Sequence, residues 1–235
     1  MRDVVIAADP DAVAAEVADR FLTRIAAVQS SGAVPQVALT GGTVARKVHR
    51  AIAAGAAASS VDWTRIVFWW GDERFVAPGD PERNEVQARA DLLDAVGATR
   101  VHPMPDSTQA PDVGAAATAY GNEMRAEGEG EFDLVMLGMG PDGHVASLFP
   151  GFPQLGIDDT IAVPVTDSPK PPPERVSLTF AALNRSRAVW FLVTGAEKAD
   201  AVARAWAYDG SVEETPARGI IGPSVTWFVD EAAAG

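Results

Sequence analysis

The stretch VALTGGTVA, residues 37–45, joins a short apolar run to a glycine pair and then to helix-forming residues. The residues Val37 to Leu39 predict a buried strand, and the residues from Thr43 to about Ala54 predict a helix. Glycines at such a junction let backbone N–H groups approach an anion, which the positive end of the helix dipole attracts. The alternative is a tight turn with a threonine cap. A nucleotide site is not expected, because the stretch matches neither the Walker nor the dinucleotide-binding pattern.

Strand and helix patterns alternate along the whole chain. Further strands are expected at residues 4–7, 66–70, 132–137, 160–165, 175–179, 188–193 and 225–229, those at 4–7 and 132–137 buried. Further helices are expected at residues 9–31, 84–93, 113–126 and 197–207. Such alternation is typical of a three-layer α/β/α fold with a mostly parallel, Rossmann-like sheet and helices on both faces. No linker divides residues 1–235, so a single domain is expected.

Composition narrows the classes of function. The chain of 235 residues has a formal net charge of -13 and no cysteine. The acidic excess argues against a nucleic-acid partner, because phosphate backbones are bound by clustered lysine and arginine. Without cysteine there is no thiolate catalysis or zinc–thiolate site, and the histidine spacing indicates no other metal site. No signal peptide is visible and no apolar run approaches the ~20 residues of a membrane span, so a cytoplasmic protein without a membrane partner is expected.

Polar groups follow the predicted strands at four places. They are Thr40–Thr43, Asp72–Arg74, Asp142–His144 and Gly195–Lys198. In open α/β sheets, ligands bind outside the carboxyl ends of the strands. The four groups therefore predict one binding site at that edge, and the basic residues among them favour an anionic ligand.

His144 is the strongest candidate for a catalytic group. It follows a glycine-rich turn, and a histidine can take a proton from water near neutral pH. Asp142, two residues earlier, either orients the imidazole or shapes the turn, and we favour the turn. His49 lies within a predicted helix and His102 precedes Pro103 in a predicted loop, so both are interpreted as structural.

Other charged residues have both a functional and a structural interpretation. Asp72 and Arg74 can orient a sugar and stabilise developing charge, or form an exposed ion pair in a loop. Lys198 lies in the first turn of a predicted helix, where a cation opposes the helix dipole and could instead neutralise a bound anion. A solvated surface lysine is the slightly preferred interpretation. Arg175 shares a strand face with Ser177 and Thr179, and a charge on an edge strand is preferred for it.

The pattern as a whole resembles the 6-phosphogluconolactonase family. The resemblance is carried by residues 39–42, 70–74, the helix beginning at 84, residues 101–104, 133–150, 168–172, 175–183 and 195–198. Its most specific part is GMGPDGHVASLFP, residues 138–150. It implies a cofactor-free enzyme of the oxidative pentose phosphate pathway that hydrolyses 6-phospho-D-glucono-1,5-lactone to 6-phosphogluconate. The protein is expected to act as a monomer, with a dimer as the alternative.

The resemblance also implies roles for particular residues. His144 would be the base that activates water, with Asp72 and Arg74 near the sugar and the reacting carbonyl. The phosphate side would be formed by Gly41, Gly42, Thr43, Arg175 and Lys198. Many family members follow the glycine pair with Ser/Thr-Thr-Pro, whereas this chain has Thr43-Val44-Ala45. The missing proline at the helix start weakens the assignment of Thr43 more than that of the glycines.

Two rival functions remain open at this point. Glucosamine-6-phosphate deaminases are similar in fold and in the Gly-Gly and Asp-Gly-His segments, but they carry Asn-Glu-Pro after the histidine. Here residues 147–150 contain no carboxylate, and Arg74 stands where those enzymes have an aromatic residue. A non-catalytic sugar-phosphate sensor would be expected to carry a DNA-binding module, whereas the first predicted strand begins at Val4. Ligand binding without lactone hydrolysis would favour the sensor.

Overall fold

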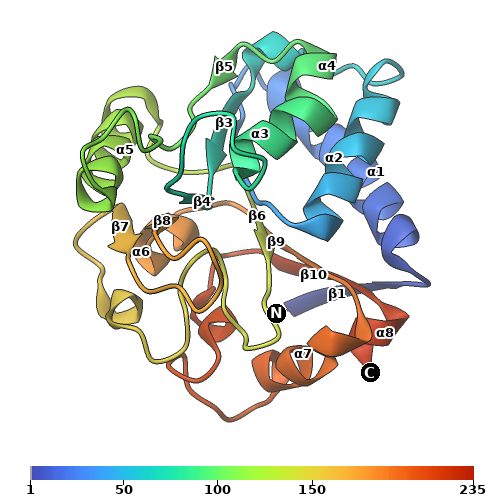
Figure 1. Ribbon diagram of the computed structural model, residues 1–235. Helices are drawn as coiled ribbons and strands as arrows, with labels where there is room; N and C mark the ends of the chain where they lie inside the picture. Colours follow the sequence, from blue (N-terminus) through green and yellow to red (C-terminus); the bar gives the residue numbers. More distant parts are fainter. Residues whose placement is uncertain (1) are drawn as a thin grey trace.

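The computed structural model describes residues 2–235, and its centre is a sheet of seven parallel strands. The strand order is β1-β10-β9-β6-β2-β3-β5 (Figure 1). Their bounds are β1 (Arg2–Ala7), β2 (Gln36–Leu39), β3 (Val67–Trp70), β5 (Arg100–Val101), β6 (Leu134–Gly138), β9 (Val189–Val193) and β10 (Val225–Asp230). The predicted parallel sheet is confirmed, with the short edge strand β5 in addition to the predicted strands.

Helices cover both faces of this sheet (Figure 1). They are α1 (Pro10–Ser30), α2 (Thr43–Ala56), α3 (Asn84–Ala88), α4 (Asp94–Val96), α5 (Val113–Glu127), α6 (Phe180–Asn184), α7 (Ala199–Trp206) and α8 (Glu231–Ala234). A π-helical turn, Arg89–Leu93, joins α3 to α4, and short 3₁₀ turns lie at Trp63–Arg65, Pro153–Gly156, Ala196–Lys198 and Pro216–Gly219. The predicted three-layer α/β/α arrangement is confirmed.

The first helix shows how local sequence sets an element. Asp9 caps α1 by accepting hydrogen bonds from the backbone N–H groups of Asp11 and Ala12, at 2.9 and 2.8 Å. Pro10 occupies the first turn, where no backbone donor is needed. Apolar residues at helical spacing, among them Phe21 and Ile25, are fully buried. The cap and the apolar stripe together explain why the helix starts and packs as the sequence predicts.

A second sheet was not predicted. The strands β4 (Asp72–Arg74), β8 (Arg175–Leu178) and β7 (Ala162–Val165) pair antiparallel, with β8 in the centre. The prediction therefore missed β4, which was expected to be a loop, and did not separate β7 and β8 from the parallel sheet. Residues 166–174 form no helix, and without a crossover helix two consecutive strands pair antiparallel.

The strand β1 is also less buried than predicted. It lies at the edge of the large sheet and pairs only with β10. Val4 and Ile6 are 37% and 57% exposed, so the prediction of a buried strand was wrong. An edge strand has one neighbour in the sheet, and apolar β-branched residues alone do not reveal how many neighbours a strand has.

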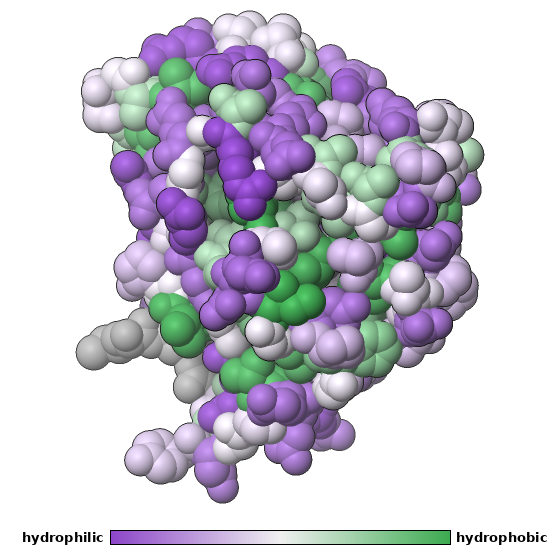
Figure 2. Space-filling model, turned by 90° about the vertical axis from the view of Figure 1, so that its left-hand side faces the viewer, coloured by the Kyte–Doolittle hydropathy of each residue, from purple (hydrophilic) through white to green (hydrophobic). Residues whose placement is uncertain are grey.

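Hydrophilic residues cover much of the surface (Figure 2). The face shown in Figure 2 is predominantly hydrophilic, with apolar residues visible in a hollow near its centre. No helix within residues 2–235 is long and apolar enough to cross a membrane.

The sheet order creates a crevice between β2 and β6. These strands are neighbours, but from β2 the chain continues through α2 to β3, whereas from β6 it continues to β9 on the opposite side. In doubly wound folds, ligands bind outside the strand carboxyl ends at such a switch point. The loops that follow β2 and β6 therefore meet where a site is expected.

Candidate active site

A pocket of about 210 Å³ lies at this switch point. Its lining includes the predicted residues Gly41, Gly42, Asp72, Arg74, His144, Arg175 and Lys198. It also includes Asn84 and Lys170, which were not predicted as site residues. A larger cavity of about 410 Å³, near Gln36 and Trp69, contains none of the predicted site residues. The convergence of polar groups therefore marks the smaller pocket as the candidate active site.

Thr43 is the one predicted site residue that does not line this pocket. It is the exposed first residue of α2. Gly42 precedes it with a φ of 97°, a conformation that favours glycine. The two glycines that precede α2 therefore line the pocket, whereas Thr43, its first residue, is exposed to solvent.

His144 and Asp142 contact each other through their side chains. The distance from His144 Nδ1 to Asp142 Oδ1 is 2.5 Å, and the same oxygen accepts the His144 backbone N–H at 3.3 Å. Asp142 thus both shapes the turn and orients the ring, so the preference for the turn alone was wrong. Burial raises the pKa of Asp142, but the hydrogen bond to His144 and the charge of His144 have the larger opposite effect and lower the pKa to about 2. An ionised Asp142 favours a proton on Nδ1 and leaves Nε2 to act as a base.

Glycine at position 140 is needed for this arrangement. A Cβ atom there would overlap both the His144 ring and the Asp142 carboxylate. The turn is closed by hydrogen bonds from Gly140 N to His144 O at 3.0 Å and from Gly143 N to Gly140 O at 2.9 Å. The ring of Phe149 packs against that of His144, with 4.6 Å between centroids. The glycine-rich segment therefore holds the His144 imidazole in place.

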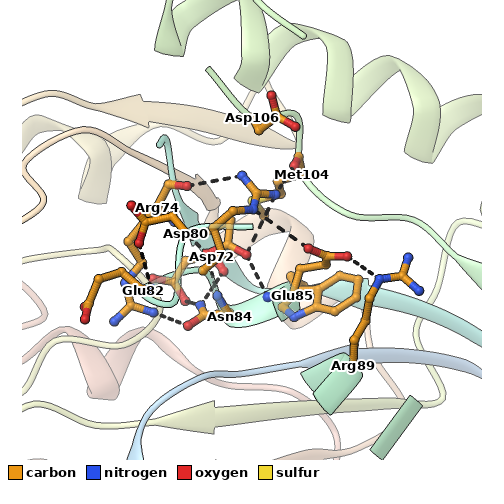
Figure 3. Close-up of polar contacts among 12 residues, drawn as sticks. Asp72, Arg74, Asp80, Glu82, Asn84, Glu85, Arg89, Met104 and Asp106 are labelled. Atoms are coloured by element: carbon orange, nitrogen blue, oxygen red, sulfur yellow. Dashed lines mark hydrogen bonds and ion pairs between the residues drawn. The ribbon is translucent and has the colours of Figure 1, made fainter. Parts of the chain in front are cut away.

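Asp72 and Arg74 project from β4 into a network of hydrogen bonds (Figure 3). Asp72 Oδ2 accepts from Ser147 Oγ at 2.7 Å, which connects β4 to the loop that carries His144. Arg74 Nη1 donates to Asn84 Oδ1. Asp72 is buried and makes no ion pair with Arg74 among the residues that the structure describes. The interpretation of an exposed loop pair is therefore wrong.

Arg175 is likewise not an edge-strand charge. It is 4% exposed and lies on β8, the central strand of the small sheet. Its guanidinium donates to the carbonyl oxygens of Lys170 at 2.9 Å and Pro172 at 3.2 Å. Burial lowers the pKa of Arg175, while the charge of Asp72 acts in the opposite direction. Arg175 thus holds the loop that brings Lys170 to the pocket.

Two lysines supply positive charge to the pocket. Lys198 is partly buried, and its pKa is lowered first by burial and then by the charge of Lys170. The interpretation of Lys198 as a solvated surface residue is therefore wrong. Sequence reasoning missed Lys170, although its segment, residues 168–172, formed part of the family resemblance. Together the lysines form a local basic cluster in an acidic protein.

The other two histidines lie outside the pocket. His102 Nδ1 is 2.7 Å from Glu123 Oε1, and its ring stacks on Trp69. His49 lies in α2 and is buried, and neither ring nitrogen has a hydrogen-bond partner within residues 2–235. The same described residues contain no group of three or more His, Cys, Asp or Glu side chains arranged to hold a metal ion.

His49 is expected to make stability depend on pH. Burial lowers its pKa from 6.5 to about 4, with the charge of Asp91 opposing and that of Arg46 adding to the shift. Below pH 6.5 His49 therefore binds a proton in the unfolded chain, whereas in the folded protein it stays neutral until about pH 4. When the pH falls from 7 to 5, the free energy of unfolding of the parent should decrease by about 2 kcal/mol more than that of the His49→Met variant. Urea unfolding at both pH values measures this difference.

The matched control is Ile52→Met, which changes a neighbouring buried residue of the same helix. It should keep the full pH dependence of the parent protein. An unchanged pH dependence in His49→Met would show that His49 does not cause it.

Comparison with known proteins agrees with this geometry. The family described as glucosamine-6-phosphate isomerases/6-phosphogluconolactonase matches residues 8–227. A 6-phosphogluconolactonase of Streptomyces coelicolor is 42% identical, over 98% of this chain and 93% of its own length. The human 6-phosphogluconolactonase is 38% identical, over 83% of this chain and 78% of its own.

A solved structure of 6-phosphogluconolactonase from Trypanosoma brucei superposes with a TM-score of 0.87 at 27% identity, covering 100% of this chain and 98% of that one. A monomeric glucosamine-6-phosphate deaminase shares the fold, with a TM-score of 0.84 at 18% identity, covering 99% of this chain and 98% of its own. With its sequence match, its parallel sheet and the pocket at the switch point, this chain belongs to the glucosamine-6-phosphate isomerase/6-phosphogluconolactonase family.

Proposed function

We propose that this chain hydrolyses 6-phospho-D-glucono-1,5-lactone to 6-phosphogluconate, a step of the oxidative pentose phosphate pathway. The observation that carries the proposal is His144, held by Asp142 in a pocket that also contains Arg74 and two lysines. An imidazole with a free nitrogen suits general-base activation of water. The lysines suit a phosphorylated substrate, and the relatives named above bear the name of this activity.

The phosphate binds at the end of the pocket formed by Gly41, Gly42, Lys170 and Lys198. The backbone N–H groups at the start of α2 and the two ammonium groups provide the positive potential. Arg175 supports this side by holding the main chain of Lys170. Binding the phosphate fixes the distance between the lactone carbonyl and His144.

The reaction begins when His144 Nε2 takes a proton from water as the oxygen attacks C1. Arg74 stabilises the negative charge that develops on the carbonyl oxygen. When the tetrahedral intermediate collapses, the bond from C1 to the ring oxygen breaks and the imidazolium returns a proton to that oxygen. A positioned base contributes about 10²–10⁴-fold and an oxyanion donor about 10²–10³-fold.

The experiment is a pH-stat assay of acid release from freshly prepared 6-phosphogluconolactone, corrected for spontaneous opening. Enzyme-dependent acid release that is lost in His144→Asn supports the proposal. Ammonia release from glucosamine 6-phosphate would instead indicate the deaminase. Binding of 6-phosphogluconate without any lactone hydrolysis would indicate the sensor.

Lys198→Ala is expected to raise KM with little change in kcat. The lysine contributes charge to the phosphate end of the pocket, whereas the reacting carbonyl lies near His144. Steady-state kinetics on the lactone measures both constants. The matched control is Lys47→Ala, because Lys47 pairs with Asp11 at the surface, at 2.5 Å. A fall in kcat with an unchanged KM would contradict a phosphate-binding role.

We further propose that residues 1–235 act as one domain and as a monomer, with a dimer as the alternative. The residues that line the pocket supply each of the proposed roles from a single chain. We place the enzyme in the cytoplasm, because its proposed substrate is a phosphorylated intermediate of sugar metabolism. Neither nucleic acid nor membrane is a proposed partner, and no cofactor takes part in the proposed reaction.

A further inference from the structure

The side chain of Asn84 lies between Asp72 and Arg74 (Figure 3). Its Nδ2 donates to the backbone oxygen of Asp72 at 2.8 Å and lies 3.4 Å from Asp72 Oδ1. Its Oδ1 accepts from Arg74 Nη1. Asn84 is 1% exposed and lines the pocket, so both ends of its amide are committed to groups assigned to the reaction.

Asn84 is the only side-chain hydrogen-bond partner of the Arg74 guanidinium within residues 2–235. Arg74 Nε is buried and has no partner in the same part of the chain. A guanidinium is a planar fork whose direction is set by the groups it donates to. The orientation of Arg74 therefore depends on Asn84.

The main chain of Asn84 is held by Glu73. Glu73 Oε1 accepts the backbone N–H groups of Arg74 and Asn84, both at 2.8 Å, and Oε2 accepts that of Glu85 at 2.9 Å. Arg83 Nη2 lies 4.0 Å from Glu73 Oε2 and donates to Met104 O at 2.7 Å. Glu73 and Arg83 are 1% and 2% exposed. This buried pair joins the start of α3 to β4, so a displacement of Asn84 would also strain the strand.

The loop after β2 packs against the same amide. A Cβ atom at position 41 would overlap the Asn84 side chain. Asn84 therefore fills the space between the glycine pair, β4 and α3, and its side chain has little freedom to rotate. A side chain fixed in this way can fix another, which is the property required of a positioning group.

We propose that Asn84 is a positioning residue that orients the Arg74 guanidinium and the Asp72 carboxylate for lactone hydrolysis. Glu73 and Arg83 hold its main chain in place. The proposal rests on the proposed function, because Arg74 is assigned there to the developing oxyanion. Asn84 acts through its neighbours and takes no proton itself. Its removal should therefore lower kcat through Arg74 and Asp72, whereas Lys170 and Lys198, which make no hydrogen bond with Asn84, should still bind the phosphate.

The kinetic test uses Asn84→Ala, with Gln87→Ala as the matched control. Gln87 lies on the same helix, and its amide donates to Pro81 O outside the pocket. Misplacing a reacting group by about 1 Å can cost ~10²-fold, so kcat should fall by about 10–100-fold in Asn84→Ala, with KM changed less than about threefold. In the Arg74→Ala background, adding Asn84→Ala should lower kcat much less than it does in the parent, because the part of its effect that acts through Arg74 is already lost and only the part through Asp72 remains. An equal loss in both backgrounds would overturn the proposal.

A second readout does not depend on activity. The ¹⁵N resonances of the Arg74 side chain, assigned by their loss in Arg74→Lys, report rotation of its guanidinium. Rotation should be slow in the parent and in Gln87→Ala, and fast in Asn84→Ala. Unchanged rotation would overturn the positioning role even if activity falls. Should the parent show no lactonase activity, the proposed function fails, while the resonances still decide whether Asn84 orients Arg74.

The isosteric Asn84→Asp keeps the test decisive if the alanine variant does not fold. Its carboxylate can still accept from Arg74 Nη1 but would face the Asp72 oxygens in place of a donor. Arg74 should therefore stay restrained in the NMR spectrum while kcat falls, because Asp72 is displaced. Wild-type kcat in a folded Asn84→Asp would overturn the role assigned to its contact with Asp72.

Discussion

His144→Asn is expected to lower kcat for lactone hydrolysis by about 10²–10⁴-fold, while the product 6-phosphogluconate still binds. Asparagine keeps a polar side chain of similar reach but has no nitrogen that can take a proton from water. The phosphate end of the pocket, with its lysines and glycines, is unchanged by the substitution. The pH-stat assay measures kcat, and isothermal titration measures product binding.

The control for this prediction is His102→Asn, which removes an imidazole that pairs with Glu123 away from the pocket. Its kcat should remain near that of the parent. Near-normal turnover in His144→Asn would rule out the base assignment. If the variant loses both product binding and turnover, His144 contributes to the shape of the pocket rather than to proton transfer.

Gly140→Ala is expected to approach the same loss of kcat, although it adds one methyl group and removes no functional group. The added Cβ would overlap the His144 ring and the Asp142 carboxylate, so the pair must separate or shift. Because general-base catalysis needs the nitrogen within hydrogen-bond reach of the attacking water, such a shift removes most of its contribution, roughly 10²-fold or more. Steady-state kinetics together with a thermal unfolding scan separates loss of catalysis from loss of fold.

Gly156→Ala provides the matched control. It is the same substitution at a glycine where a Cβ atom would meet nothing within 4 Å. Gly156→Ala should leave kcat and the melting temperature nearly unchanged. Parent-like kcat in Gly140→Ala would mean that the pocket tolerates a displaced His144, which contradicts the proposed geometry.

Much of the fold was predictable because the patterns are local. Apolar runs such as Val37–Leu39 and the spaced apolar residues of α1 predict a strand and a helix without knowledge of the rest of the chain. Strand and helix alternation then implies parallel pairing, because a crossover helix returns the chain in the same direction. The antiparallel sheet containing Asp72–Arg74 escaped prediction, because three residues carry too short a pattern and their partner strand lies about a hundred residues away.

The residues of the candidate site likewise fall into those that a local pattern predicts and those that only tertiary contacts reveal. His144 and the glycine pair stand out because their motifs are continuous in sequence and follow strands. The burial of Arg175 was not predicted from its own strand, because it depends on β4 and β7 on either side of that strand. Asn84 carries no local signal beyond its place at the start of a helix. Its importance follows from Asp72, Arg74 and Glu73, which surround it.

The sequence by itself therefore determined the fold class, the glycine-rich turns and the histidine on which the proposed reaction depends. Each is encoded by residues within a few positions of one another, where propensity and periodicity act directly. Only the tertiary structure decided that Asp142 contacts the imidazole, that Thr43 lies outside the pocket and that Asn84 lies between Asp72 and Arg74. These are matters of ångström-scale distance between side chains, which depend on how the sheets and loops pack and which no local pattern encodes.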